Sequence, residues 1–265
     1  FDKFSKAYRA NSKKYLNHIK KIGKKYDLII PTTEPEMIAL SKKNTKLNNY
    51  PILINKPKVI KLFVDKLKTF QFLKKNNLNS PKFCMGLNTI KKYNKPFFLK
   101  TKIGSGNKNY KLINSEKKFY NLKNLQKDQW IAQEFLGSKS NEYTCALIKI
   151  GNYINSLILK RKLISGETYY AEVIKNKKLE NILYKIADLV NLEGCINIQL
   201  KMKKNKSTIF EINPRLSSTV MMRYKLGFKD CLWWINFYLL NKTPNLKTIK
   251  FKKKKILRIY NEVFV

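Results

Sequence analysis

Two short segments in the second half of the chain carry the side chains best suited to chemistry. Residues 196–200 and 209–215 both alternate apolar and polar residues, a pattern typical of half-buried strands. A polar, lysine-rich stretch separates them, so the pair predicts an antiparallel hairpin. Alternation puts Gln199 on the polar face of the first strand. It puts Glu211 and Asn213 on one face of the second strand, about 6–7 Å apart.

A hairpin of this kind can gather hard oxygen ligands beside a guanidinium group. The carboxylate of Glu211 and the amide oxygens of Gln199 and Asn213 suit Mg²⁺, and Arg215, just past the strand, suits a phosphate. Nucleotide chemistry needs both kinds of group. An ordinary hairpin with a solvated polar face is the alternative, and the pattern alone does not separate the two.

The run Glu-Ile-Asn-Pro-Arg that ends at Arg215, followed by Leu-Ser-Ser, resembles the metal-binding strand of ATP-grasp enzymes. It is closest to the carbamoyl-phosphate synthase large-subunit type, and the resemblance extends from about Tyr26 to the C-terminus. It implies that Gln199, Glu211 and Asn213 hold two Mg²⁺ ions, or Mn²⁺, that bridge the phosphates of ATP. It also implies that the arginine faces the transferred phosphoryl group or the acyl phosphate.

Two lysines and a glycine loop resemble the phosphate-binding parts of the same family. Lys66 stands at an Asp-Lys helix start and is implied to reach an ATP phosphate, with a solvated surface lysine as the alternative. The strand 96–100 ends in Lys100, which is implied to contact the α- and β-phosphates as a point charge. The loop after this strand resembles the flexible phosphate-covering loop of the lid, with a plain glycine turn as the alternative: Gly104, Ser105 and Gly106.

The strand 130–136 resembles the hinge strand whose backbone hydrogen-bonds adenine. The implied adenine-binding residues are Gln133, Glu134, Phe135 and Leu136. Glu142 takes the place of the ribose-binding acid, and the alternative is a glutamate at a strand start that pairs with a lysine. The resemblance also implies catalytic roles for Lys162, which ends the strand 154–162, and for Arg215.

The order of elements along the chain predicts an α/β protein. We expect an ATP-grasp fold in which two α+β subdomains clasp ATP, with an ATP-grasp domain at 56–265 and a lid subdomain at about 82–134. Residues 27–31 predict a buried parallel strand within a partial, Rossmann-like pre-ATP-grasp domain at 1–55. The first strands of that domain are missing and the chain opens at Phe1 without a methionine, so we expect an N-terminally truncated protein.

Three further segments complete the predicted fold. The longest apolar run, residues 231–240, predicts a buried helix with Asp230 as its N-cap. Apolar positions within 179–190 predict the clearest amphipathic helix of the chain, a core element. Residues 256–264 alternate like a closing strand.

The formal net charge is +39, from 56 Lys and Arg against 17 Asp and Glu. Taken alone, this charge predicts a nucleic-acid or anionic-membrane partner. The lysines, however, are scattered through every segment, and Asn and Ile are also abundant, as an AT-rich codon supply favours. We therefore favour compositional drift together with anionic substrates, and we expect no specific nucleic-acid partner.

Cysteine and histidine usage narrows the classes of site and compartment. The four cysteines are far apart without C-x-x-C spacing, which argues against a zinc site or a disulfide framework and favours a cytoplasmic location. His18 is the single histidine, so a catalytic triad that needs one is not expected. No signal peptide and no apolar run of the length needed to cross a bilayer is visible, so we expect no membrane span.

The resemblance implies an ADP-forming ligase that activates a carboxylate as an acyl phosphate and joins it to an amine or similar nucleophile. The expected partners are ATP and small-molecule carboxylate and amine substrates, and a homodimer is compatible with the sequence. A basic nucleic-acid-binding protein and a non-catalytic nucleotide-binding homologue are the alternatives. The retained ligand set argues against the second: Gln199, Glu211, Asn213 and Lys100. Lys201 is expected to lie beyond this cluster.

Overall fold

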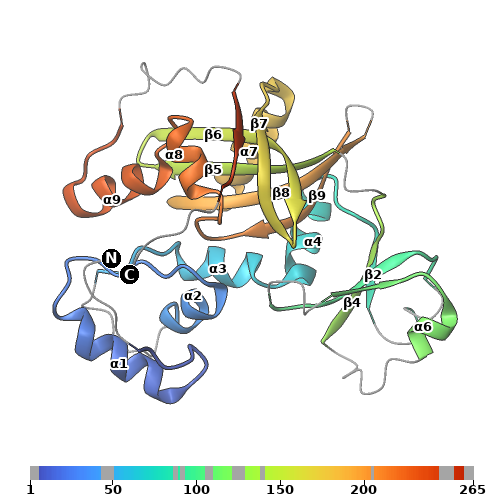
Figure 1. Cartoon of the computed structure of the whole chain (residues 1–265), viewed down its shortest axis with the longest axis horizontal. Helices are drawn as coiled ribbons and strands as arrows, with labels where there is room; N and C mark the ends of the chain where they lie inside the picture. The colour runs from blue at the N-terminus through green and yellow to red at the C-terminus, as the bar shows by residue number, and fades with distance from the viewer. Residues whose placement is uncertain are drawn as a thin grey trace.

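The computed structural model describes residues 6–42, 51–85, 89, 93–104, 110–120, 129–137, 141–203, 206–244 and 254–259. Ser105, Gly106, the tip of the predicted hairpin at 204–205 and residues 260–264 of the predicted closing strand lie outside these ranges. Two antiparallel sheets organise the described residues. The larger sheet and its helices form the upper body in Figure 1, and the smaller sheet stands to its right.

The larger sheet has the strand order β10-β7-β6-β5-β8-β9, and every neighbouring pair is antiparallel. Its strands are β5 (Glu142–Ile150), β6 (Tyr153–Ile164), β7 (Glu167–Val173), β8 (Gly194–Lys203), β9 (Lys206–Asn213) and β10 (Lys255–Leu257). The pairing of β10 with β7 agrees with the predicted closing strand at residues 256–257, whereas residues 258–259 lie outside the strand.

One face of this sheet packs against α7 (Lys177–Leu189). The helix begins at Asn176, whose Oδ1 accepts a hydrogen bond from the N–H of Leu179, a standard N-cap. Leu179, Leu183 and Ile186 recur at helical spacing and are at most 1% exposed. The predicted amphipathic core helix is therefore confirmed.

The opposite face packs against α9 (Asp230–Leu240), with α8 (Val220–Lys225) beside it. The prediction of a buried helix is wrong for much of α9, because Leu240 is 58% exposed and only Asp230 and Trp234 are buried. The helix is apolar all round, but the sheet covers just one side of it. Asp230 is the first helical residue and not the N-cap, which is Lys229.

The predicted hairpin is confirmed as the pair β8 and β9. Its register shifts once, because Leu200 pairs with Ile209 whereas Gln199 pairs with Glu211, which leaves Phe210 as the extra residue of a β-bulge. The bulge lets Ile209 and Ile212 pack into the same core as α7, although they stand three residues apart.

The smaller sheet has the order β1-β4-β2-β3, again antiparallel throughout. Its strands are β1 (Phe83–Met85), β2 (Phe97–Thr101), β3 (Tyr110–Ile113) and β4 (Trp130–Glu134). A short helix, α6 (Glu116–Tyr120), packs near β3. Phe97, Leu99 and Ala132 are completely buried on one face. The opposite face of the smaller sheet is directed toward the rest of the molecule.

The described residues of the amino-terminal part include four helices: α1 (Lys13–Gly23), α2 (Glu34–Leu40), α3 (Pro57–Phe63) and α4 (Lys66–Lys75). The predicted buried strand at 27–31 is wrong in extent, because only Ile29 pairs, as an isolated parallel bridge with Ile52. Ile30 is 36% exposed. Within the described residues, this segment pairs only with the segment at Ile52. Its apolar composition alone is therefore not sufficient to bury it.

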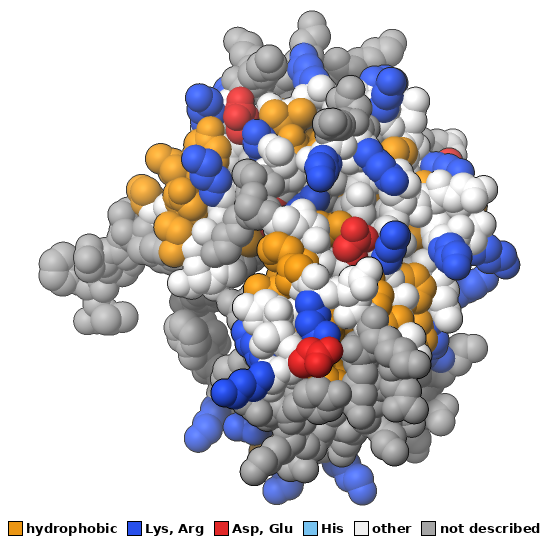
Figure 2. Space-filling view, turned by 90° about the vertical axis from the view of Figure 1, so that its right-hand side faces the viewer, with side chains coloured by type: hydrophobic (Ala, Val, Ile, Leu, Met, Phe, Trp, Pro, Cys, Tyr) orange, Lys and Arg blue, Asp and Glu red, His pale blue; other side chains and the backbone are white. Residues whose placement is uncertain are grey.

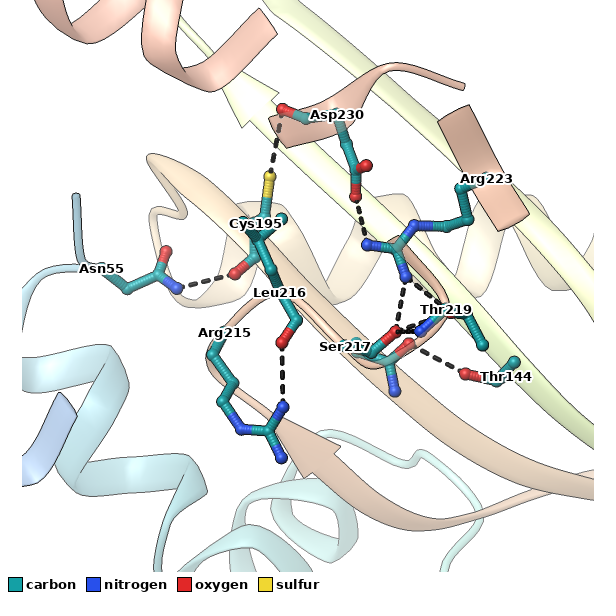
Figure 3. Close-up of polar contacts among 10 residues, drawn as sticks. Asn55, Thr144, Cys195, Arg215, Leu216, Ser217, Thr219, Arg223 and Asp230 are labelled. Atoms are coloured by element: carbon teal, nitrogen blue, oxygen red, sulfur yellow. Dashed lines mark hydrogen bonds and ion pairs between the residues drawn. The ribbon is translucent and has the colours of Figure 1, made fainter. Parts of the chain in front are cut away.

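Asn55 joins the amino-terminal part to β8 and to the residue that follows β9. Its Nδ2 donates to the carbonyl of Cys195 at 2.7 Å (Figure 3). It also donates to the carbonyl of Pro214 at 2.8 Å. Gly194 fits beneath this joint with φ +132°, and a Cβ there would stand 2.5 Å from the Trp234 ring and 2.6 Å from Asn55 Oδ1. The close approach requires glycine.

We expect Gly194→Ala to lower the free energy of unfolding by about 3 kcal/mol, because it adds a steric clash to an unfavourable φ. Gly151→Ala is the matched control, since its φ is +52° and its nearest neighbour would lie at an ordinary 3.5 Å. It should cost only about 1 kcal/mol. Urea denaturation of both variants measures the difference, and equal losses would contradict the packing explanation.

Candidate active site

The hairpin brings the predicted metal-ligand residues to one face of the larger sheet. Gln199 pairs directly with Glu211, and Asn197 pairs with Asn213. Because the bulge at Phe210 resets the alternation, Glu211 and Asn213 share the face of Gln199, opposite the α7 core. The structure thus gathers one carboxylate and two side-chain amides that were predicted together.

Arg161 lies at the centre of this face, although sequence reasoning gave it no role. Its Nη2 donates to Glu142 Oε1 at 2.6 Å and to Gln199 Oε1 at 2.8 Å, and its Nε donates to Glu142 Oε1 at 3.2 Å. The side chains of Arg161 and Glu142 are only 10% and 11% exposed. Glu142 therefore pairs with an arginine, in place of the lysine that the alternative interpretation offered.

Lys162 is not brought to this cluster. It is exposed, it follows Arg161 on β6 and therefore points to the other side of the strand, and its Nζ lies 5.4 Å from the centre of the Tyr170 ring. Its predicted catalytic role gains no support from this position. Arg161, the middle residue of the Lys-Arg-Lys run, faces the site. It continues the alternation of Leu157 and Leu159 along the strand, and this alternation is the signal that could have identified it.

Lys100 reaches the hairpin from the smaller sheet. Its Nζ lies 5.5 Å from the centre of the Phe98 ring and 5.7 Å from that of Phe210. Burial lowers the pKa of Lys100 below its usual 10.5, and the charge of Lys66 lowers it further, whereas Glu211 acts in the opposite direction. The two sheets therefore place cations and a carboxylate within electrostatic reach of one another.

Glu34 is a second carboxylate in this region, contributed by the first turn of α2. It is only 6% exposed, and its Oε1 accepts from the backbone N–H of Gly104 at 3.1 Å. Lys66 Nζ donates to the carbonyl of the same glycine at 2.6 Å. Gly104, the first residue of the predicted phosphate loop, is thus held from both of its sides.

The carboxyl group of Glu34 is harder to ionise than usual. Burial raises its pKa above the ordinary 4.5 and the charge of Glu211 adds to the effect, whereas Lys66, Arg215 and the Gly104 hydrogen bond oppose it. These influences identify the groups that surround it.

The predicted hinge spans the last two residues of β4 and the two residues after it. Gln133 is 3% exposed, the backbone N–H of Glu134 donates to the carbonyl of Lys82, and its Oε2 accepts from the Lys82 N–H. Phe135 packs edge to face with Phe98 at 5.4 Å between ring centres. Leu136 follows in a segment without regular secondary structure.

Lys201 belongs to the site, which corrects its expected position beyond the cluster. It stands two residues past Gln199 on the same face of β8, and its Nζ donates to the carbonyl of Gly137 at 2.8 Å. Burial lowers its pKa below 10.5, whereas the charge of Glu142 raises it. Lys201 therefore ties the segment after the hinge to the larger sheet.

Arg215 begins a loop that other side chains hold in place (Figure 3). Its Nη1 donates to the carbonyl of Leu216 at 2.9 Å. Further along, Arg223 donates to Thr219 Oγ1 and to Asp230 Oδ2, each at 2.7 Å. The Arg223–Asp230 pair is only 2% exposed, so it fixes the loop from within the core.

The donor set suits a metal that shares its coordination with phosphates. The described residues contain no group of three or more His, Cys, Asp or Glu side chains that could hold an ion alone. Mg²⁺ is commonly bound through one or two carboxylates together with substrate phosphates. Gln199, Glu211 and Asn213 offer one carboxylate and two amides, which fits that mode.

The described residues include no helix with the length and apolar character needed to cross a membrane. Figure 2 shows the basic side chains spread over much of the visible face, with acidic and apolar side chains among them.

A family model described as ATP-grasp domain matches residues 63–219, more than half of the 265 residues. The comparison with curated proteins finds no match. Among solved structures, N5-carboxyaminoimidazole ribonucleotide synthetase from Thermus thermophilus has a TM-score of 0.73 at 13% identity, over 94% of this chain and 70% of its own.

Two further structures give the same result. Biotin carboxylase from Campylobacter jejuni has a TM-score of 0.70 at 16% identity, over 91% of this chain and 61% of its own. N5-carboxyaminoimidazole synthetase from Staphylococcus aureus, complexed with ADP, has a TM-score of 0.68 at 18% identity, over 90% of this chain and 66% of its own. The chain thus spans 61% to 70% of the length of these three proteins. The predicted ATP-grasp fold is confirmed, and the Rossmann-like character of the first 55 residues stays a prediction.

Because the pKa of Glu34 is raised, the folded protein holds this proton to a higher pH than the unfolded chain does. Ionised Glu34 therefore costs stability, and the cost develops as the pH rises from 4.5 through the folded-state pKa. Glu34→Gln keeps an acceptor for Gly104 and should be at least as stable as wild type at pH 7, with an advantage that shrinks toward pH 4.5. Urea unfolding at both pH values measures this. A variant that is less stable than wild type at pH 7, but not at pH 4.5, would mean that Lys66 and Arg215 outweigh burial.

Proposed function

The chain belongs to the ATP-grasp family, and we propose that it is an ATP-dependent, ADP-forming ligase. It would activate a carboxylate as an acyl phosphate and join it to an amine or a similar nucleophile. The observation that carries this proposal is the convergence of Lys66 and Lys100 on the face that bears Gln199 and Glu211. Cations for a polyphosphate thus lie beside oxygen donors for its metal.

The triphosphate would lie between the two sheets. We propose the smaller sheet as the lid predicted at about 82–134, with Lys100 on its inner face and the loop that starts at Gly104 covering the phosphates. Lys66 already binds the carbonyl of Gly104, so it is positioned at the start of that loop. Glycine backbone there lets N–H groups approach phosphate closely.

Gln199, Glu211 and Asn213 would hold magnesium, or manganese, against the phosphates. Bound metal would neutralise part of the negative charge that develops on the transferred phosphoryl group. The cross-strand pairing of Gln199 with Glu211 supports this assignment, because it keeps two of the donors side by side.

Adenosine would occupy the end of the site next to the hinge. The backbone of Gln133 to Leu136 would read adenine, and Glu142 would accept from the ribose hydroxyls. Lys201 supports this orientation, since it ties Gly137 to the strand that also carries Gln199. The base, the sugar and the phosphates would then lie in sequence along β8.

The reaction needs no protein nucleophile. Positioning and charge neutralisation supply most of the catalysis in phosphoryl transfer. Arg215 would face the acyl phosphate, on a loop that the buried Arg223–Asp230 pair keeps in place. The substrate carboxylate and amine remain to be identified by a screen for ADP release across pooled acids and amines.

The net charge keeps a nucleic-acid-binding protein as the second candidate. The spread of basic side chains over the face in Figure 2, among acidic and apolar ones, favours general anion attraction over a single binding stripe. We therefore rank it below the ligase.

We expect MgATP to raise the melting temperature, because a ligand that binds only the folded state stabilises it by mass action. GTP should raise it less, because the hinge backbone would be matched to adenine. Differential scanning fluorimetry with MgATP, MgGTP and inorganic triphosphate tests both expectations. Equal shifts with all three would mean polyanion binding to a basic surface and would overturn the nucleotide assignment.

We expect Glu211→Gln to lower ATP-dependent ADP release by about 10²-fold or more, because it removes the one carboxylate among the three proposed metal ligands. Its free energy of unfolding should change by less than about 1 kcal/mol, since the residue lies on a polar face and not in the core. Coupled-enzyme assays and urea denaturation give the two values.

The matched control is Glu193→Gln, just before β8. Glu193 pairs with Lys56 at 3.4 Å, and its side chain is 51% exposed, so the same chemical change falls outside the site. Its turnover should equal that of wild type. Full turnover in Glu211→Gln would remove this residue from the metal site, and with it the main support for a ligase.

A further inference from the structure

Arg161 donates at the same time to two side chains with proposed binding roles. These are Glu142, which would bind the ribose, and Gln199, which would bind the metal. We propose that Arg161 is a nucleotide-binding residue that exchanges partners: its guanidinium leaves Glu142 and Gln199 and binds the triphosphate when MgATP enters. The inference rests on the proposed function, because these two groups are ligands only if the chain binds MgATP.

The geometry places the guanidinium across three neighbouring strands. Arg161 on β6 pairs in register with Glu142 on β5, and Gln199 lies on β8, the strand on the other side of β5. One nitrogen, Nη2, serves both acceptors, at 2.6 Å to Glu142 Oε1 and 2.8 Å to Gln199 Oε1. The ribose end and the metal end of the site therefore share one donor.

This arrangement competes with the proposed ligands. The side-chain oxygen of Gln199 is its only acceptor, and a metal ion would have to use that oxygen. A guanidinium bonded to it places a positive charge against the incoming cation, which opposes metal binding. Glu142 Oε1 likewise accepts twice from Arg161, so ribose hydroxyls would compete with a charge-assisted bond.

A displaced guanidinium needs a new anionic partner, because an unpaired charge in a poorly hydrated site is costly. The side chain of Arg161 is only 10% exposed, so water cannot readily replace Glu142. Of the described carboxylates nearby, Glu211 would bind metal and Glu34 already accepts from Gly104. A triphosphate supplies the missing charge, and arginine matches phosphate oxygens with its planar fork.

The exchange couples metal binding to nucleotide binding. Nucleotide would draw the guanidinium away from Gln199 and so raise the affinity for metal. Linkage requires that metal raises the affinity for nucleotide by the same factor. Metal alone should bind weakly, whereas metal and nucleotide should each bind more tightly in the presence of the other.

Three variants test this proposal. Arg161→Met removes the charge and the donors, and Arg161→Lys keeps the charge but has a single nitrogen in place of the fork. Lys160→Met is the matched control, because it removes one charge from the opposite face of the same strand. Calorimetric titrations measure the Kd for Mn²⁺ without and with a non-hydrolysable ATP analogue, for the analogue with Mg²⁺, and for adenosine.

In wild type, the analogue should tighten Mn²⁺ binding by at least about tenfold. In Arg161→Met, Mn²⁺ alone should bind more tightly than in wild type, and the Kd for the Mg²⁺ analogue should rise by about tenfold to a hundredfold, as expected for lost charge-assisted bonds. Adenosine should change far less. Arg161→Lys should recover part of the affinity for the analogue, and Lys160→Met should match wild type.

An Arg161→Met or Arg161→Lys protein that binds the analogue as tightly as wild type would overturn the exchange, even if its melting temperature falls. Equal losses for adenosine and the analogue would also overturn it, because Arg161 would then act only by orienting Glu142. If wild type binds adenosine and the analogue but nucleotide leaves Mn²⁺ affinity unchanged, the coupling fails while the proposed function stands. If wild type binds no nucleotide, the proposed function fails as well.

Discussion

The pairing of β8 with β9 is the constraint on which the site depends. Successive side chains of a strand point to opposite faces of the sheet. The residues that form a site on a sheet must therefore all point to the same face. Here both Ile209 and Ile212 face the core that β9 shares with α3, α4 and α7, and regular alternation cannot satisfy both. The bulge at Phe210 resolves the conflict, and in the same step it sets Glu211 beside Gln199. The core and the site therefore share one irregularity.

Charge compensation among poorly hydrated side chains is the second requirement. Two carboxylates of the site have specific donors: Glu142 pairs with Arg161, and Glu34 accepts from Gly104. Cations outnumber carboxylates there, and burial already lowers the pKa of Lys100. A polyphosphate would offset this excess of positive charge within the site, which general attraction by surface charge would not do.

Local patterns in the sequence predict the elements well, and long-range pairing explains what they do not predict. Apolar periodicity identifies α7, and alternation identifies the hairpin with its oxygen donors. In the Lys-Arg-Lys run of β6, however, the three basic residues alone do not show which of them faces the site. The prediction therefore selects Lys162, although Arg161 is the residue that faces the site. The bond between Lys201 and Gly137 and that between Glu34 and Gly104 join segments 64 and 70 residues apart, which no local pattern encodes. Apolar residues occur on every side of α9, so its sequence does not show which side of the helix the sheet covers.

Gly104 connects the amino-terminal helices with the smaller sheet and explains how these two parts can act together. Glu34 reaches it from the amino-terminal helices, Lys66 from the start of α4, and the glycine itself follows β2 of the smaller sheet. A carboxylate and an ammonium group thus hold the two polar backbone groups of one residue, the N–H and the C=O of the glycine that opens the loop. Triphosphate would compete for Lys66, and among the described residues Glu34 would still hold the N–H of Gly104. The amino-terminal helices are therefore connected directly to the start of the proposed phosphate loop, so a substrate bound near Glu34 and a nucleotide bound near Lys66 would act on the same backbone.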